Sequence, residues 1–485
     1  MEKAAPIMNS FILGFEECLQ AMSGRALSPV PNGSPWGVSI DSRTIKPGEL
    51  FFAISGDRFD GHNFIEPAMQ NGACGAVLSR PVELPVGKFF IAVPDVRKAL
   101  LDLAAACRKK WGGRLICITG SAGKTTTKER IADFLARRYR THRSQGNFNN
   151  EIGLSLALLG LQASHQRAVV EIGMNRPGEI AALAATAAPE TGVLTCVAPV
   201  HLEFFASLDK IADAKAELIS FLRSDGSLVY NLDDPLLVER AAVFEGRKVS
   251  FGFSDQADVR ALRVQSKGLN GSAFEVSFGG EIYSGHTTLP GIHNIYNWLA
   301  AAATALAEGL PFRQIVQGKD HEPVVRHRGS ILRMAAGFTV IDDSYNSNPK
   351  ALESMLDLLR GTSEFQRRLV VAGEMRELGV SSAALHRQCG RNAALAGVDL
   401  LMGVAGDARY FLEGAEEAGL DHSRILWADS FREAIELLIP QIQAGDLVLI
   451  KGSRGVQLDR VVDALLTDFP LVAQEDDSEP EVQSC

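Results

Sequence analysis

The run TGSAGKTT at residues 119–126 follows a short apolar stretch and precedes a helical pattern at residues 128–138. Backbone N–H groups in such a turn, with the positive end of the helix dipole, bind phosphate oxygens. Lys124 is of the right type to neutralise terminal phosphates, and the Thr125 hydroxyl to ligate Mg²⁺. Ile118 stands where the usual motif has its first glycine, so the loop is shortened. We predict a nucleotide-binding turn formed by Gly120, Ser121, Ala122, Gly123, Lys124, Thr125 and Thr126.

Two further candidates follow predicted strands. Glu171 ends the apolar run at residues 168–171, and His201 comes directly after the run at 192–200. A metal at a phosphate site needs a carboxylate from a neighbouring strand, and ligands of parallel sheets gather at the carboxyl ends of the strands. Taken alone, Glu171 is better explained as a surface glutamate and His201 as an ordinary core or surface histidine. Beside the predicted nucleotide turn, both become candidate ligands.

Other polar clusters are candidates for anion or ligand binding. Near the N-terminus they are Ser39, Asp41, Ser42 and Arg43, and a Gly-rich run at residues 55–63 that contains Asp60, Gly61 and His62. An arginine beside glycines and polar caps can bind a diphosphate, although turn formation explains the same composition equally well. Three polar turns, at residues 342–349, 373–375 and 451–454, follow successive predicted strands. We expect these three turns to form one ligand-binding edge.

The elements that must position these residues group into three units. Strand and helix patterns alternate from about residue 35 to 111, again from residue 115, and again from residue 338, while residues 258–288 show the strict alternation of an antiparallel sheet. We predict an α/β fold with a small N-terminal α/β domain (1–112), a central P-loop ATPase-like parallel sheet with an antiparallel appendage (113–320), and a C-terminal Rossmann-like doubly wound domain (321–473). A disordered acidic tail is expected at 474–485.

Composition excludes several classes of protein. The formal charge of −9 in 485 residues disfavours nucleic-acid binding, which needs a basic face. No apolar run approaches the roughly 20 residues of a membrane span, so no membrane insertion is expected. The seven cysteines contain no C-x-x-C pair, which favours reduced thiols and a cytoplasmic location.

Four longer runs identify a resemblance. They are RFDGH at residues 58–62, QGNFNN at 145–150, DSYNSNP at 343–349 and EMRELG at 374–379. With the shortened P-loop they resemble the Mur ligases, ATP-dependent ligases that build the peptidoglycan stem peptide, over about residues 39–466. Within that family the chain is similar to the branch that joins D-alanyl-D-alanine to UDP-N-acetylmuramoyl-tripeptide. The branch that adds the third residue carries an Asp-Asn-Pro-Arg motif, which this chain lacks.

The resemblance implies roles for particular residues. Lys124 and Thr125 would bind ATP and Mg²⁺, and Glu171 and His201 would be metal ligands together with Thr125. Lys215 would be the family's carbamoylated lysine, an anion that also belongs to the metal site. From its helical surroundings alone, Lys215 is an ordinary solvated lysine. The remaining implied residues contact adenine, ATP phosphates, ribose or the amino-acid and UDP-sugar substrates: Asn294, Asn297, Arg328, Asp343; Ser39, Asp41, Ser42, Arg43, Asp60, Gly61, His62, Asn147, Asn150, Tyr345, Asn346 and Asn348.

The resemblance also implies an acyl-phosphate mechanism. Because acyl phosphates hydrolyse in water, we expect the third domain to close over the central one. Phe204 stands where the family usually has glycine, so we expect it to crowd the pocket beside the metal. We expect a monomer.

Two other ligases remain as alternatives, the third-residue ligase and a folylpolyglutamate synthetase, which shares the shortened P-loop. A non-ligase protein switched by ATP hydrolysis is a third.

Overall fold

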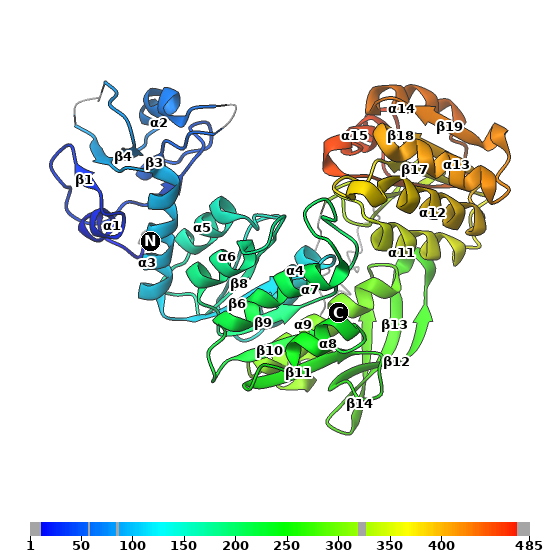
Figure 1. The fold of residues 1–485 in the computed structure, drawn as a ribbon, viewed down its shortest axis with the longest axis horizontal. Helices are drawn as coiled ribbons and strands as arrows, with labels where there is room; N and C mark the ends of the chain where they lie inside the picture. The colour runs from blue at the N-terminus through cyan, green and yellow to red at the C-terminus, as the bar shows by residue number, and fades with distance from the viewer. Residues whose placement is uncertain (1–10, 57–58, 84–86, 319–325, 473–485) are drawn as a thin grey trace, which may run out of the picture.

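The computed structural model describes residues 11–56, 59–83, 87–318 and 326–472. Figure 1 shows three α/β units in chain order, with the first and third units at opposite ends of the central one. This arrangement confirms the predicted three-domain α/β fold. The expected acidic tail at 474–485 lies outside the described residues.

The N-terminal sheet has five strands in the order β1-β5-β4-β3-β2, of which only β1 runs antiparallel to its neighbour. Its strands are β1 (Arg25–Ala26), β2 (Gly37–Ser39), β3 (Glu49–Phe52), β4 (Gly75–Leu78) and β5 (Phe89–Ala92). Its helices are α1 (Phe15–Ala21), α2 (Ile65–Gln70) and α3 (Val96–Trp111). Asp95 caps α3 by accepting from two backbone N–H groups, and Gly112 ends it in the left-handed conformation.

The central sheet is a continuous nine-stranded sheet in the order β14-β13-β12-β11-β10-β9-β6-β8-β7. Strands β7 to β12 are parallel to β6. Strand β13 pairs antiparallel with β12, and β14 pairs antiparallel with β13, so the predicted appendage extends the main sheet. The strands are β6 (Arg114–Thr119), β7 (Thr141–Arg143), β8 (Arg167–Glu171), β9 (Thr191–Leu194), β10 (Ser227–Asn231), β11 (Arg247–Gly252), β12 (Val259–Ser266), β13 (Ser272–Phe278) and β14 (Glu281–Thr287).

Helices cover both faces of this sheet because successive strand residues point to opposite sides. In β6, Leu115 and Cys117 join the core shared with α3, while Ile116 and Ile118 join a second core against α4 and α9. The helices are α4 (Lys124–Ala136), α5 (Glu151–Leu159), α6 (Glu179–Ala187), α7 (Leu208–Ala216), α8 (Pro235–Ala241), α9 (Ile292–Ala307) and α10 (Phe312–Gln317). The first core is continuous with that of the N-terminal sheet, so α3 joins the two domains through buried apolar contacts.

The third sheet has the order β15-β16-β20-β17-β18-β19, and all its strands but β15 are parallel. Its strands are β15 (Ser330–Arg333), β16 (Thr339–Asp343), β17 (Arg367–Gly373), β18 (Leu400–Val404), β19 (Ile425–Ala428) and β20 (Asp446–Lys451). Its helices are α11 (Pro349–Arg360), α12 (Ser382–Leu395), α13 (Arg409–Glu417), α14 (Phe431–Leu438) and α15 (Asp459–Asp468). One face packs against α11, α12 and α13, and the other against α14 and α15, which is the doubly wound arrangement predicted.

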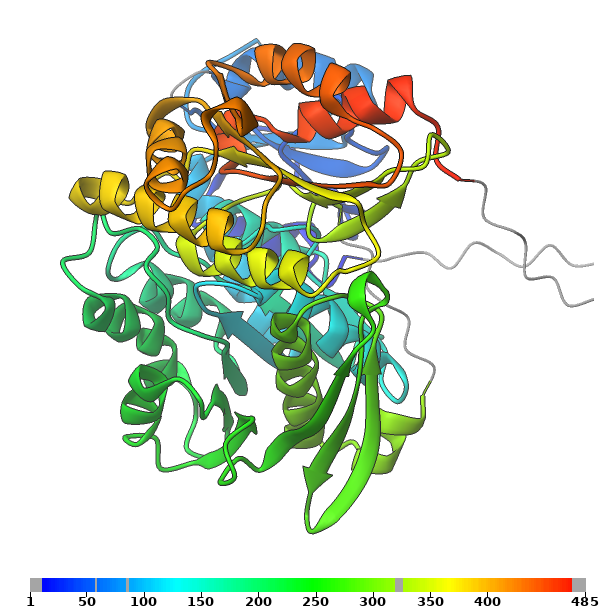
Figure 2. The ribbon, with the colours of Figure 1, turned by 90° about the vertical axis from the view of Figure 1, so that its right-hand side faces the viewer.

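The tip of the β12–β13 hairpin connects the central and third domains. Leu269 at this tip is 4% exposed and belongs to the hydrophobic core of the third domain. Asn270 beside it accepts a 2.8 Å hydrogen bond from Arg333. Figures 1 and 2 show this hairpin reaching the third domain, which lies above the central sheet.

Among the residues that the structure describes, no helix combines the length and apolar character needed to cross a bilayer.

Candidate active site

The predicted phosphate-binding turn connects β6 to α4. Gly123 has φ +77° and caps α4, and a Cβ at this position would lie 2.4 Å from Asn297 Oδ1. Glycine is therefore required both by the backbone conformation and by the close approach of α9. Lys124 Nζ donates to the Gly120 carbonyl at 2.8 Å, so its ammonium group lies over the turn. The turn has the geometry of an anion-binding helix N-terminus.

The segment after β9 forms hydrogen bonds with the phosphate-binding turn. The apolar run at residues 192–200 predicted a strand that reaches His201, whereas β9 ends at Leu194. The Thr195 hydroxyl donates to the Ala122 carbonyl of the turn at 2.7 Å. The strand stops because the next two carbonyls have other partners: that of Thr195 accepts from Asn231 Nδ2 at 3.1 Å, and that of Cys196 accepts from Ser121 N–H at 2.8 Å. Their backbone groups are therefore unavailable for a longer ladder.

Two oxygen ligands of the kind that Mg²⁺ prefers lie together beside the turn. The Thr125 hydroxyl donates to Glu171 Oε2 at 2.6 Å, and Glu171 is 1% exposed. Asn149 Nδ2 donates to the other oxygen of Glu171 at 2.8 Å and so fixes its orientation. Hard oxygen donors placed next to a phosphate-binding turn fit Mg²⁺. Sequence reasoning missed Asn149, although its neighbours Asn147 and Asn150 were candidates.

The loop that carries these asparagines is anchored by a buried lysine. Lys128 on α4 is 0% exposed, and its Nζ donates to the carbonyls of Ser144 and Gly146 at 2.6 and 2.7 Å. It also forms an ion pair with Glu129 at 2.9 Å. Asn150, at the end of the loop, caps α5 by accepting from Gly153 N–H. Asn150 therefore terminates the loop, while Asn147 and Asn149 line the cavity described below.

Two lysines at the site carry lowered pKa values. Burial lowers the pKa of Lys124, with Arg328 adding to the effect and Glu171 opposing it. Burial, then the nearby Lys124, lowers the pKa of Lys215 to about 7. Lys215 is 3% exposed, and none of the described residues accepts a hydrogen bond from its Nζ. Lys215 is therefore close to half neutral at physiological pH, unlike the solvated lysine that its sequence suggests.

His201 contacts the third domain. Its Nδ1 forms a short hydrogen bond with a carboxylate oxygen of Glu377, and Glu203 N–H donates to the Glu377 carbonyl at 3.1 Å. His201 and Glu377 both have positive φ, +56° and +64°. Non-glycine residues adopt that region only where surrounding contacts hold them. The described residues include no group of three or more His, Cys, Asp or Glu side chains arranged for a metal, and Lys215 as an ammonium cannot be a ligand.

A cavity of about 970 Å³ lies between the central and third domains. Its walls follow β6, β8, β9 and β10 on one side and β16, β17 and β20 on the other, so the carboxyl ends of two parallel sheets face each other. Predicted residues gathered in its wall are Ser121, Ala122, Gly123, Lys124, Thr125, Thr126, Glu171, His201, Asn147, Asn294, Asn297, Arg328, Asp343, Tyr345, Asn346 and Asn348. Its size suits a nucleotide with a second substrate.

One end of the cavity has features of a base and ribose site. Asp233, which follows β10, accepts from Tyr296 at 2.9 Å and from two backbone N–H groups. Asn297 donates to Asn294 at 3.0 Å, so this predicted amide pair is linked internally. His293 Nδ1 is buried without a hydrogen-bond partner among the described residues. Asp233 could have been found from the sequence, because it follows a parallel strand. Glu171 was selected by the same rule, that ligands gather at the carboxyl ends of parallel strands.

The third-domain wall is basic. Lys451 Nζ lies 2.5 Å from Asp343 Oδ2 and also donates to the Asn346 carbonyl. The Arg328 guanidinium stacks 4.2 Å from the centre of the Tyr345 ring, and Arg454 donates to the Tyr345 hydroxyl at 3.1 Å. Arg328 and Arg454 thus present positive charge to the cavity, as an anionic ligand requires. The sequence had placed Lys451 and Arg454 in one of the three polar turns expected to form a ligand-binding edge, without an individual role for either residue.

The remaining predicted residues lie elsewhere. Gly120 and Lys215 do not line the cavity. Phe204, which was expected to crowd the pocket, does not line it either, and the centre of its ring lies 5.5 Å from the Arg176 guanidinium. In the N-terminal domain, hydrogen bonds from Arg43 lower the pKa of Asp41 to about 2. Hydrogen bonds from His62, Ser55 and Arg80 hold the pKa of Asp60 well below its usual range. The N-terminal candidates outside the cavity wall are Ser39, Asp41, Ser42, Arg43, Asp60, Gly61 and His62.

The fold and cavity define a three-domain protein whose P-loop faces a cavity between two α/β sheets. Family models for the Mur ligase family, catalytic domain, the Mur ligase middle domain and the Mur ligase, glutamate ligase domain match residues 36–108, 118–305 and 327–454. The chain is 34% identical to the UDP-N-acetylmuramoyl-tripeptide--D-alanyl-D-alanine ligase of Escherichia coli, covering 88% of this chain and 93% of that one. The chain belongs to the Mur ligase family of ATP-dependent ligases.

Solved structures agree with this assignment. A MurF crystal structure from Acinetobacter baumannii superposes with a TM-score of 0.84 at 29% identity, covering 94% of this chain and 98% of that one. MurF ligase from Thermotoga maritima in complex with ADP superposes with a TM-score of 0.73 at 25% identity, covering 89% and 97%.

Proposed function

We propose that this chain joins D-alanyl-D-alanine to UDP-N-acetylmuramoyl-tripeptide, with ATP as the driving substrate and an acyl phosphate as intermediate. The observation that carries the proposal is the cavity in which the P-loop lysine Lys124 faces Arg328 and the polar turns of the third domain. The similarity to relatives that carry this name supports the choice of substrates.

The chemistry explains why both domains are needed. A carboxylate is a poor electrophile, so the terminal carboxylate of the tripeptide first takes the γ-phosphoryl group of ATP. That step brings two anions together, and Lys124 and Arg328 neutralise the charge that develops. D-alanyl-D-alanine first releases a proton from its ammonium group to solvent, and the neutral amine attacks the acyl carbon. The tetrahedral intermediate then expels phosphate, which takes up the second nitrogen proton.

Thr125 and Glu171 would hold Mg²⁺, because their oxygens are adjacent, buried and next to the phosphate-binding turn. The ion, when bound, supplies positive charge to the transferring phosphoryl group. Asn149 keeps the Glu171 carboxylate aimed at that position. Lys215, with its pKa near 7 and no hydrogen-bond acceptor among the described residues, is suited to take up CO₂ as a carbamate. Carbamoylation would convert the side chain of Lys215 into an anion, whose negative charge is compatible with the metal ion and with His201.

Water hydrolyses an acyl phosphate, so the walls of the cavity must also exclude water from the intermediate. We propose that the third domain closes on the central one during turnover and that the His201–Glu377 contact marks the closed arrangement. The N-terminal clusters around Asp41 and Asp60 would bind the UDP-sugar part of the acceptor. We also propose a cytoplasmic location, which supplies ATP and suits the six free thiols of the described cysteines.

Mass spectrometry of reaction products tests the proposal. The chain is incubated with ATP, Mg²⁺, D-alanyl-D-alanine and UDP-N-acetylmuramoyl-tripeptide whose third residue is either diaminopimelate or lysine. We expect a pentapeptide product with at least one acceptor, and none from Lys124→Met. ATP hydrolysis without either peptide substrate, and no pentapeptide, would instead indicate an ATP-driven switch. Glutamate addition to a folate acceptor would indicate a folylpolyglutamate synthetase.

A further inference from the structure

The nucleophile of the proposed reaction is an amine, and its binding site is a separate question. An α-amino group has a pKa of about 8, so D-alanyl-D-alanine arrives mainly as a cation at neutral pH. A cavity rich in arginine and lysine repels that cation unless a carboxylate receives it. The inference below rests on the proposed function and concerns which carboxylate does so.

Five carboxylates from the described residues line the cavity, and four are already committed within their own domain. Glu171 accepts from Thr125 and Asn149 at the proposed metal position. Asp343 is neutralised by Lys451. The two that follow β10, Asp233 and Asp234, each accept from several donors of the central domain. None of the four is placed to receive a further cation.

Glu377 differs from the other four carboxylates. Its side chain is 38% exposed, and its one side-chain partner among the described residues is His201, across the gap between the domains. A single imidazole N–H uses one of about four lone-pair positions on a carboxylate, so acceptor capacity remains.

The backbone fixes where this carboxylate points. Glu377 has φ +64°, and its carbonyl accepts from Glu203 N–H at 3.1 Å. Gly379, two residues on, packs against Glu203, and a Cβ there would lie 3.1 Å from Glu203 Cα. The segment is therefore clamped between the domains with Glu377 in the cavity wall beside His201, which lines the same cavity as Lys124.

We propose that the Glu377 carboxylate binds the ammonium group of the incoming D-alanyl-D-alanine and, with His201 as its orienting partner, holds the amine beside the acyl phosphate. Glu377 is then a substrate-binding residue with specificity for an amine. In an alternative role, as a contact that only holds the domains together, it would affect all substrates alike.

A comparison of two ligands that differ only in the amine separates these roles. Propionyl-D-alanine lacks the amino group of D-alanyl-D-alanine and is used as a competitive inhibitor. We expect Glu377→Gln to raise the KM for D-alanyl-D-alanine at least tenfold, since hydrogen bonds to charged groups are the strong ones. The inhibition constant of propionyl-D-alanine, and the KM values for ATP and UDP-tripeptide, should change less than about twofold. Glu377→Asp should recover part of the loss.

Glu374→Gln is the matched control, because Glu374 lies in the same turn but bonds to Asp407 N–H and Arg376 and not to His201. It should leave the KM for D-alanyl-D-alanine nearly unchanged. If Glu377→Gln turns over too slowly, dissociation constants of the two ligands are measured by calorimetry with UDP-tripeptide and a non-hydrolysable ATP analogue. Equal weakening of both ligands, or no weakening, would overturn the proposal. An absence of pentapeptide from the unsubstituted chain would instead overturn the proposed function.

Discussion

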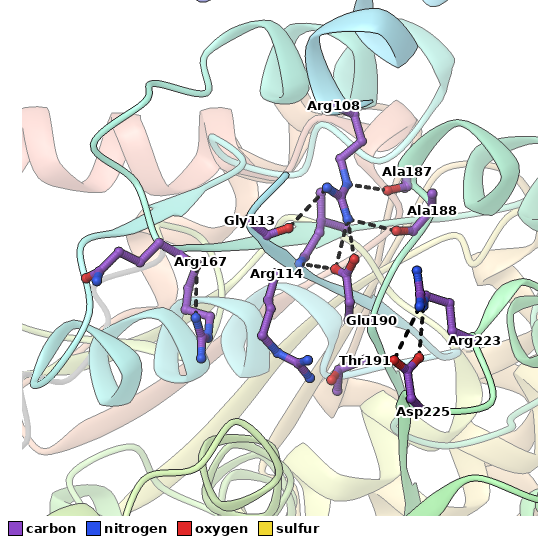
Figure 3. A network of polar contacts seen from close by, with 12 residues as sticks. Arg108, Gly113, Arg114, Arg167, Ala187, Ala188, Glu190, Thr191, Arg223 and Asp225 are labelled. Atoms are coloured by element: carbon purple, nitrogen blue, oxygen red, sulfur yellow. Dashed lines mark hydrogen bonds and ion pairs between the residues drawn. The ribbon is translucent and has the colours of Figure 1, made fainter. Parts of the chain in front are cut away.

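Arg108, at the end of α3, places Nη2 2.8 Å from both carboxylate oxygens of Glu190, beside β9. The same guanidinium donates to the carbonyls of Ala187, Ala188 and Gly113, as Figure 3 shows. Arg108 is 6% exposed, and Glu190 also accepts from Leu115 N–H at 2.7 Å. Together with the shared apolar core, this contact attaches the N-terminal domain firmly to the central one. Closure is therefore expected at the third domain.

Arg108→Met should lower the free energy of unfolding by about 3 kcal/mol, because it leaves a largely buried carboxylate and several carbonyls without their partner. Denaturant unfolding measures the change. The control is Arg223→Met: Arg223 and Asp225 form an ion pair in the same view of Figure 3, but both side chains are 70% exposed. That control should leave stability unchanged within error, and equal losses in the two variants would contradict this description.

Lys128→Met should impair catalysis more than it impairs nucleotide binding. Removal of Nζ leaves the carbonyls of Ser144 and Gly146 unbonded and frees the loop that carries Asn149. The Glu171 carboxylate then loses its fixed orientation, so we expect kcat to fall at least tenfold with little change in the Kd for ATP measured without Mg²⁺. Lys98→Met, on an exposed ion pair of α3, is the control and should be indistinguishable from the unsubstituted chain. A matching fall in both variants would argue against the loop-anchoring role.

Lys215 should carry a carbamate that depends on pH. CO₂ reacts with the neutral amine, whose fraction rises through the pKa of about 7. After CO₂ is removed, recovery of activity at one fixed concentration of dissolved CO₂ should therefore be slow at pH 6 and faster at pH 8. Nuclear magnetic resonance with ¹³C-bicarbonate should show a carbamate signal that is absent from Lys215→Met, which should also lose at least 100-fold in kcat. An identical signal in both proteins would contradict this assignment.

His142 should make the fold sensitive to mild acid. Burial, with the neighbouring His165, lowers its pKa to about 4 in the folded chain. The unfolded chain takes up a proton near pH 6.5 and the folded one does not, so stability falls as the pH drops from 6.5 to 4, by about 3 kcal/mol in full. Thermal unfolding of His142→Gln across this range should show a shallower loss. His422→Gln, at an exposed histidine, should lose stability as steeply as the unsubstituted chain. A shallower loss in His422→Gln but not in His142→Gln would contradict the burial of His142.

Local signals predicted one half of the site. The strand, turn and helix around Lys124 are contiguous in sequence, so their type and spacing specify the phosphate-binding turn. Glu171 and His201 followed from the rule that ligands gather at the carboxyl ends of parallel strands. The same rule could have selected Asp233.

Contacts between domains were not predictable in this way. Glu377 faces His201 from 176 residues along the chain, and Leu269 enters the core of the third domain from the central hairpin. Neither contact leaves a periodic or local pattern, because each depends on how two separately folded sheets are placed. The burial of Lys215 is similar: its helix looks amphipathic and solvated, and only the position of Lys124 and the turn explains its pKa. The early end of β9 also depends on a distant partner, the turn it supports.

Transfer of an oxygen atom from the acceptor to phosphate decides whether the carboxylate is activated by phosphorylation. UDP-N-acetylmuramoyl-tripeptide labelled with ¹⁸O in its terminal carboxylate is turned over with ATP, Mg²⁺ and D-alanyl-D-alanine, and the released orthophosphate is examined by mass spectrometry. An acyl phosphate leaves one labelled oxygen in the phosphate for each pentapeptide formed, and we predict this stoichiometry. Pentapeptide accompanied by unlabelled phosphate would contradict the account.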